Sequence, residues 1–228
     1  MREFTHEAIH ELTHLDGKIF QTVRLLLFKP GALTLEWLRG RRARYVNPLR
    51  LYLICSLLFF ALASLAPETT ITVTEQDRKE AGEEALKRSQ EVVRDVGERF
   101  VHQMPRGMFV VMPAFGLLTW LFYRKAQPYY VPHLYYSLHV HSFAFVVFAI
   151  AAACSFAGPY GDAAGKTIKL VLFPYYYLAL RRVFGGTRGQ TAWKGTLIGI
   201  LYLAVLMGVL LLLIMLVLRT IRPSLNVS

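Results

Sequence analysis

The chain has 228 residues, of which 54% are hydrophobic, and it carries a formal net charge of +11. This composition is too apolar for an ordinary soluble domain, and the basic residues flank apolar segments instead of covering one folded surface, which argues against a nucleic-acid partner. Anionic lipid headgroups are the partners that this arrangement favours, and we expect Cys55 and Cys154, which lie in apolar runs, to pack as small hydrophobic residues.

Residues 1–47 are predicted to form cytoplasmic amphipathic and interfacial helices. Apolar residues recur at helical spacing from Phe4 to Ile19. After an interruption at Asp16-Gly17, the segment from Ile19 to Phe28 is so apolar that we expect it to lie on the membrane or against other helices. Lys29-Pro30-Gly31 predicts a turn, and a short helix from Ala32 to Leu38 is expected to follow it.

Five later segments are apolar enough to cross the hydrocarbon layer, which is roughly 30 Å thick, as helices. We predict transmembrane helices over residues 48–66, 107–123, 133–157, 167–184 and 195–218. Pro48 stands at a first-turn position of the first helix, and Lys169 and Pro174 interrupt the fourth. The predicted fold class is therefore all-α, a polytopic membrane protein with about five spans.

Charge predicts the orientation of these spans. Residues 67–106 hold nine of the fifteen acidic residues, and oppositely charged pairs four residues apart, such as Glu83 and Lys87, predict a water-exposed helical loop. The segments on the N-terminal side of the membrane hold fifteen Lys and Arg, whereas the other side holds four outside the acidic loop. Because positive residues favour the cytoplasmic side, we expect a cytoplasmic N-terminus and an extracytoplasmic C-terminus.

Histidines offer a candidate metal site. His6 to His10 and His10 to His14 are overlapping copies of the His-Glu-x-x-His zinc-protease signature, in which histidines four apart on a helix can share one ion. His133, His139 or His141 could supply a further ligand, although His139 and His141, two apart on a helix, point to opposite sides and cannot chelate one metal together. The alternatives are a polar face on a surface helix and hydrogen-bonded histidines packed inside the bundle.

Two further features bear on function. His139, His141 and neighbouring tyrosines could line a small transporter or channel, but no span contains Asp or Glu, which weighs against ion coupling. Gly195 and Gly199 have the spacing that allows helices to approach closely, either in a homo-oligomer or within the chain.

Several short motifs together resemble an uncharacterised family of bacterial inner-membrane proteins, classed as a domain of unknown function. They are Leu15-Asp16-Gly17-Lys18, Thr22-Val23-Arg24, Lys29-Pro30-Gly31, Gly40-Arg41-Arg42-Ala43-Arg44-Tyr45 and Pro48-Leu49-Arg50-Leu51-Tyr52, with a second block at Leu138-His139-Val140-His141-Ser142-Phe143. The resemblance covers roughly the first 62 residues and part of the third span. It implies a bacterial inner-membrane location and no established activity. Many family members begin with a zinc ribbon of cysteine pairs, which this chain lacks, so the membrane body is the shared feature.

The arginine-rich segment before the first span is the candidate binding site. Arginine forms forked contacts to phosphate, so we expect this segment to orient the chain and to bind lipid headgroups or phosphate. Its residues are Arg39, Arg41, Arg42, Arg44 and Arg50. The sequence favours a non-enzymatic membrane or interaction protein over two alternatives: a metal-dependent membrane enzyme that uses the N-terminal and third-span histidines, with zinc as its candidate metal, and a small transporter or channel.

Overall fold

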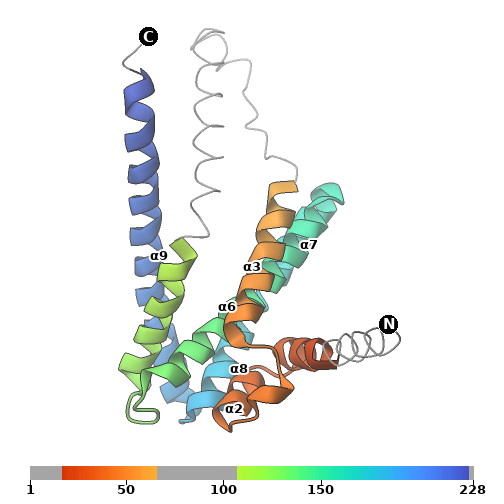
Figure 1. Ribbon diagram of the computed structural model, residues 1–228, viewed down its shortest axis with the longest axis vertical. Helices are drawn as coiled ribbons and strands as arrows, with labels where there is room; N and C mark the ends of the chain where they lie inside the picture. Colours follow the sequence, from red (N-terminus) through yellow and green to blue (C-terminus); the bar gives the residue numbers. More distant parts are fainter. Residues whose placement is uncertain (1–16, 66–106, 226–228) are drawn as a thin grey trace, which may run out of the picture. The chain divides into compact units, whose positions relative to one another are not determined.

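The computed structural model describes residues 17–65 and 107–225, with side chains up to residue 216 (Figure 1). The described residues form helices and no strand, so the all-α prediction is confirmed. The chain divides into two compact units, one of residues 1–66 and 112–201 and one of residues 67–111 and 202–228.

The first described part of the first unit consists of two helical segments and the turn between them. A helix over residues 17–28 is followed by a turn at Gly31, whose φ of 74° is a conformation that suits glycine, and then by α2 (Ala32–Leu38). The predicted turn and short helix are thus confirmed. The 3₁₀ helix η1 (Arg42–Arg44) leads into α3 (Pro48–Leu65). Asn47 starts α3, because its Oδ1 accepts a hydrogen bond from Leu49 N at 2.9 Å.

Helix α6 (Tyr130–Ser155) is the centre of the first unit and packs against α2, α3, α7 (Gly158–Lys169) and α8 (Leu172–Phe184). Its contact with α3 is aromatic: Phe145 lies 5.6 Å from both Tyr52 and Phe59 between ring centroids. Such pairs add specific geometry to apolar burial.

Small residues bring α6 and α7 close together. A Cβ atom on Gly161 would clash with the Cys154 carbonyl oxygen, and one on Gly165 would lie 3.0 Å from the Ala151 carbonyl oxygen. Helix α7 ends at Lys169, so the predicted segment 167–184 takes in the last turn of α7 and all of α8.

Two further helices complete the described chain: Gly107–Tyr123 and α9 (Arg188–Leu225). Thr187 and Gln190 form a capping box at the start of α9, in which each side chain bonds the backbone N–H of the other at 3.3–3.4 Å. In the second unit, a Cβ on Gly107 would lie 3.1 Å from Leu213 Cδ1, so the two helices touch there.

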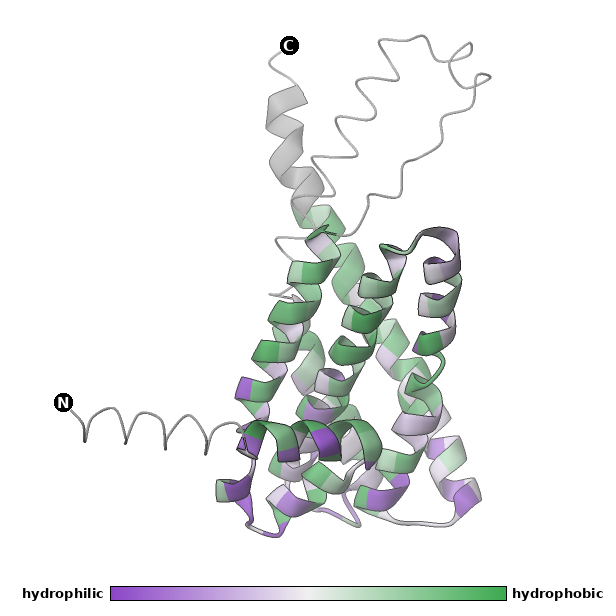
Figure 2. Cartoon of the chain, turned by 90° about the vertical axis from the view of Figure 1, so that its right-hand side faces the viewer, coloured by the Kyte–Doolittle hydropathy of each residue, from purple (hydrophilic) through white to green (hydrophobic). Residues whose placement is uncertain are grey.

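Three helical segments are long and apolar enough to cross a membrane. They are Arg42–Leu65, Tyr130–Ser155 and Arg188–Leu216, and Gly107–Tyr123 is apolar but shorter. Many of their apolar side chains are exposed, including Leu57 and Leu58 on α3. Figure 2 shows hydrophobic residues along these helices and hydrophilic residues toward the lower ends of the first unit's helices. The chain therefore has membrane-span-like helices, and the number of spans stays a prediction.

Candidate functional site

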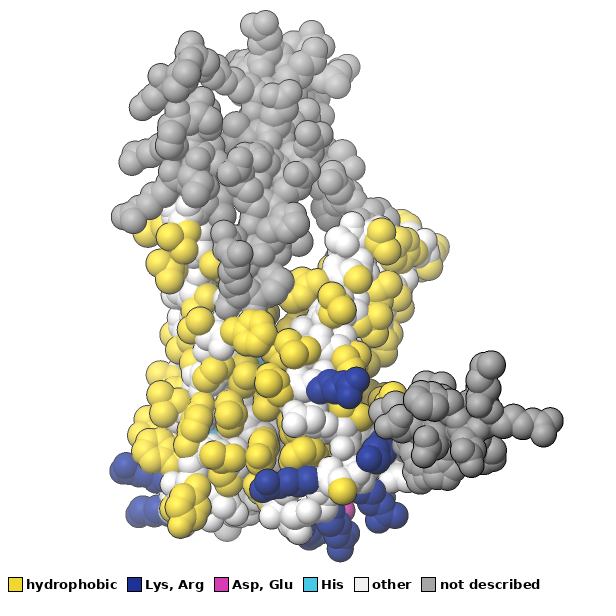
Figure 3. Space-filling model, viewed as in Figure 1, with side chains coloured by type: hydrophobic (Ala, Val, Ile, Leu, Met, Phe, Trp, Pro, Cys, Tyr) yellow, Lys and Arg dark blue, Asp and Glu magenta, His cyan; other side chains and the backbone are white. Residues whose placement is uncertain are grey.

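Basic side chains gather at one end of the first unit (Figure 3). We call this the cationic end, defined by the basic residues between positions 17 and 50 and by those of the segments 124–125, 181–188 and 194. Glu36 is the only acidic residue between positions 17 and 65, against eight Lys and Arg in the same stretch. The cationic end thus carries a large uncompensated positive charge.

The helix over residues 17–28 lies transverse to α3 and α6 at the cationic end (Figures 1 and 2). Thr22 is fully buried and fixes this helix to the segment before α3: its Oγ1 donates to Lys18 O at 2.6 Å and accepts from Val46 N at 3.0 Å. Phe20 and Phe28 are exposed, at 68% and 77%. A transverse helix with exposed aromatic residues and nearby cations has the character of an interfacial membrane helix.

Helix α8 holds the turn that follows this helix. Tyr175 Oη donates to Leu26 O at 2.8 Å, and the Arg182 guanidinium donates to Pro30 O at 2.7 Å. A Cβ on Gly31 would lie 2.8 Å from the Ala179 carbonyl oxygen, so the turn and α8 are in close backbone contact. These contacts fix where the segment after α2 presents its arginines.

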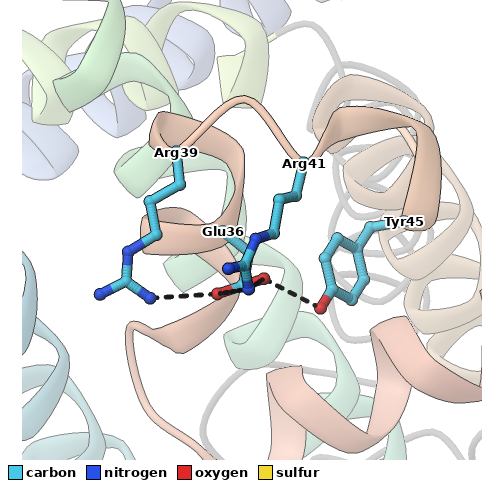
Figure 4. A network of polar contacts seen from close by, with 4 residues as sticks. All are labelled: Glu36, Arg39, Arg41 and Tyr45. Atoms are coloured by element: carbon cyan, nitrogen blue, oxygen red, sulfur yellow. Dashed lines mark hydrogen bonds and ion pairs between the residues drawn. The ribbon is translucent and has the colours of Figure 1, made fainter.

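Glu36 on α2 organises two of those arginines (Figure 4). Arg41 donates to both carboxylate oxygens at 3.0 and 3.3 Å, Arg39 donates to Oε1 at 3.2 Å, and Tyr45 Oη donates to Oε2 at 3.4 Å. Desolvation alone would raise the pKa of Glu36, but the hydrogen bonds from these three residues and the Arg41 charge outweigh it and lower that pKa. The carboxylate is therefore ionised at neutral pH and offsets part of the charge of Arg39 and Arg41.

Arg42 is held differently, by aromatic rings. Its Cζ lies 6.0 Å from the Trp37 ring centroid and 5.9 Å from that of Tyr135 on α6. The two rings are themselves 5.5 Å apart. Arginine over aromatic faces at this distance is a cation–π contact. Residues that lie almost 100 positions apart in the sequence thus form one small cluster.

The two predicted α6 histidines lie on different sides of their helix. His139 Nδ1 is 2.9 Å from Thr34 Oγ1 of α2, whereas His141 Nδ1 bonds Ser137 O at 2.8 Å and its ring lies against Phe115 of the helix Gly107–Tyr123. These different partners agree with the predicted opposite orientations of the two side chains. Both are buried, as the packed-histidine alternative requires.

The rest of the metal prediction falls on residues the structure does not describe. His6, His10 and His14 lie outside the described residues. Within residues 17–65 and 107–225, no three His, Cys, Asp or Glu side chains gather as metal ligands. Zinc binding therefore stays a prediction for the N-terminal histidines.

Gly195 and Gly199 differ in their surroundings. A Cβ on Gly195 would lie 3.2 Å from Leu180 Cδ2, and Tyr176 Oη donates to Gly195 O at 3.2 Å, so Gly195 packs against α8 of its own chain. Gly199 has open space around it. Homo-oligomer formation stays a prediction, and intrachain packing accounts for Gly195.

The arginine-rich segment was predicted as a unit, but the structure divides it. Arg39 and Arg41 pair with Glu36, and Arg42 lies on Trp37 and Tyr135. Within the described part of the chain, Arg44 and Arg50 make no side-chain hydrogen bond or ion pair. Sequence reasoning missed the roles of Glu36 and Trp37; the spacing of Glu36 three residues before Arg39 was the available signal for the first.

The comparison with family models agrees with the predicted resemblance to an uncharacterised family, and its match does not include the predicted second block at residues 138–143. Residues 16–60 match the model of a family described as "Protein of unknown function (DUF3667)". The matched stretch contains the transverse helix, α2, η1 and most of α3. Neither a curated protein nor a solved structure matches the chain.

Proposed function

We propose that the chain is an integral protein of the bacterial inner membrane, that its cationic end faces the cytoplasm, and that it acts there as a membrane or interaction protein that binds anionic headgroups. The observation that carries the proposal is the gathering of basic residues around a transverse helix, next to helices of membrane-spanning length. Basic residues near an anionic leaflet contribute about 1 kcal/mol each.

Orientation follows from the same distribution of charge. Basic residues in the segments between spans favour the cytoplasmic side. In the first unit, the cationic end holds Arg124 and Lys125 before α6, and Arg181 and Arg182 at the end of α8. The exposed Phe20 and Phe28 of the transverse helix would enter the boundary between headgroups and acyl chains.

The first test of this proposal is membrane integration. The chain, expressed with a C-terminal tag, should remain in the inner-membrane fraction after extraction with alkaline carbonate, which releases peripheral proteins. Recovery in the soluble fraction would contradict an integral protein.

The second test is lipid preference. The purified chain should bind phosphatidylglycerol more tightly than phosphatidylcholine, measured by native mass spectrometry, and its preference should weaken as salt rises, since salt screens exposed charges. A variant with Lys18, Lys29 and Arg50 changed to Gln should lose part of the preference. Equal binding of both lipids by the unaltered chain would overturn the headgroup role.

A further inference from the structure

Arg42 has a setting that none of its neighbouring arginines shares. Trp37 beneath it is 6% exposed, whereas Arg42 itself is exposed, so the guanidinium covers the outer side of the Trp37–Tyr135 pair and stays accessible. Contacts with two rings restrict the side chain. Less conformational entropy is therefore lost when a ligand binds it than with a freely moving arginine.

The donors of Arg42 are available to a ligand. Within the residues that the structure describes, its guanidinium makes no hydrogen bond and no ion pair, whereas Arg39 and Arg41 direct donors to Glu36. A guanidinium has five N–H donors arranged as a fork. A cation–π contact uses the charge of the guanidinium and none of its hydrogen bonds, so its N–H donors remain available to an acceptor with two oxygens.

The position of Arg42 indicates which acceptor this is. Arg42 begins the segment Arg42–Leu65, which is long and apolar enough to cross a membrane. An arginine at the start of such a segment lies at the level of the lipid headgroups, where phosphate groups carry the negative charge. Phosphate oxygens match the fork of a guanidinium better than they match the single ammonium of lysine.

We propose that Arg42, positioned by Trp37 and Tyr135, binds the phosphate of an anionic phospholipid through a forked contact. This inference rests on the proposed function, because it places the cationic end at an anionic leaflet. Arg42 is then the residue that binds one headgroup specifically, and the other basic residues supply attraction that depends on charge alone.

Replacement of Arg42 by lysine distinguishes a forked contact with phosphate from attraction by positive charge alone. Arg42→Lys keeps the charge but loses the fork, and it should weaken phosphatidylglycerol binding at least about fivefold in native mass spectrometry of the full chain. The matched control is Arg24→Lys, which changes an exposed arginine of the same end, on the helix over residues 17–28, and should leave binding within twofold. If Arg42→Lys bound the lipid as tightly as Arg24→Lys, the forked site would be refuted while the proposed function stood. If the unaltered chain showed no preference for phosphatidylglycerol, the proposed function would fail as well.

The positioning role of Tyr135 has its own control. Tyr135→Phe keeps the ring and should retain the preference for phosphatidylglycerol. Tyr135→Leu removes the ring and should reduce this preference as much as Arg42→Lys does. The melting temperature of Tyr135→Leu should stay unchanged. Equal lipid preference in the two variants would contradict positioning by the ring. A separate arm adds millimolar inorganic phosphate: retention of the bound lipid supports a headgroup site, and displacement of the lipid would show a soluble phosphate ligand instead.

Discussion

Glu36 is a single carboxylate that binds two arginines and a tyrosine at the cationic end. Its side chain is 13% exposed, whereas those of Arg39 and Arg41 are about 60% exposed, so solvent screens the two ion pairs. We expect the cluster to stabilise the fold by about 0.2–1 kcal/mol, the range for exposed pairs. Because this stabilisation is small, its change with pH tests the cluster more clearly than a single measurement of stability at neutral pH does.

The pH dependence has a definite sign. Because folding lowers the pKa of Glu36 below its usual value of 4.5, the stabilisation is present above pH 4.5 and is lost as the pH falls through the lower folded value. Glu36→Gln cannot ionise. The difference in melting temperature between the natural chain and Glu36→Gln should therefore be largest at neutral pH and should shrink in acid. A difference that stays constant from pH 7 into the acid range would contradict this cluster.

Sequence patterns predicted the orientation of single side chains better than they predicted which distant residues those side chains contact. The opposite orientations of His139 and His141 follow from helical periodicity alone, and the structure confirms them. The partners of the arginine-rich segment could not be predicted in the same way. Tyr135 joins Arg42 only because α2 packs on α6, and the sequence carries no local signal for contacts between distant segments.

At the scale of elements, the turn between the helix over residues 17–28 and α2 is the point where α8 fixes the N-terminal region. Gly31 has a positive φ and lies against the Ala179 backbone, whereas Gly40 also has a positive φ, 83°, but has open space around it. A side chain added at Gly40 would therefore meet backbone strain alone, whereas one added at Gly31 would meet both backbone strain and a steric clash.

We expect Gly31→Ala to lower stability more than Gly40→Ala does. Gly40→Ala places a side chain in a left-handed conformation, which costs about 1–2 kcal/mol. Gly31→Ala carries that cost and also a contact of 2.8 Å with the Ala179 carbonyl oxygen, which the turn can relieve only by moving away from α8. Melting temperatures of the two variants in detergent test the order. Equal losses would mean that the turn and α8 are not in close contact.

Helix boundaries were predictable where local signals exist. Asn47-Pro48 marks the start of α3, and the predicted segment 107–123 ends at Tyr123, where the described helix also ends. Helix α7 was not predicted, and the predicted segment 167–184 covers its last turn and all of α8. The arrangement of α7 depends on Gly161 and Gly165, which allow α7 to touch the α6 backbone, and hydropathy does not register that kind of contact.

At the scale of the whole molecule, the segment that matches the family model depends on the rest of the chain. Its buried Thr34 bonds His139 of α6, and its Leu26 and Pro30 carbonyls accept hydrogen bonds from Tyr175 and Arg182 of α8. Unpaired polar groups are costly at membrane depth. The family-matched segment is therefore one face of a larger helical unit, and its arginines are presented correctly only when α6 and α8 are in place.

Orientation in the membrane can be measured at the two ends of α6. Lys125 lies before this helix at the cationic end, and Tyr160, which is 90% exposed, lies just after it. The 26 residues of α6 extend about 39 Å at 1.5 Å per residue, so the two positions face opposite sides of a spanned bilayer. In a background with Cys55 and Cys154 changed to Ala, single cysteines at these positions can report the side.

In intact spheroplasts, an impermeant maleimide should label Tyr160→Cys and should leave Lys125→Cys unlabelled. Both should react after the membrane is permeabilised, which shows that each thiol is accessible. Positive charge drives this result, since Lys125 and its neighbour Arg124 favour the cytoplasmic side. The reverse pattern would place the cationic end outside, and a cytoplasmic headgroup site at Arg42 would then be impossible, because Arg42 belongs to the same end of the first unit as Lys125.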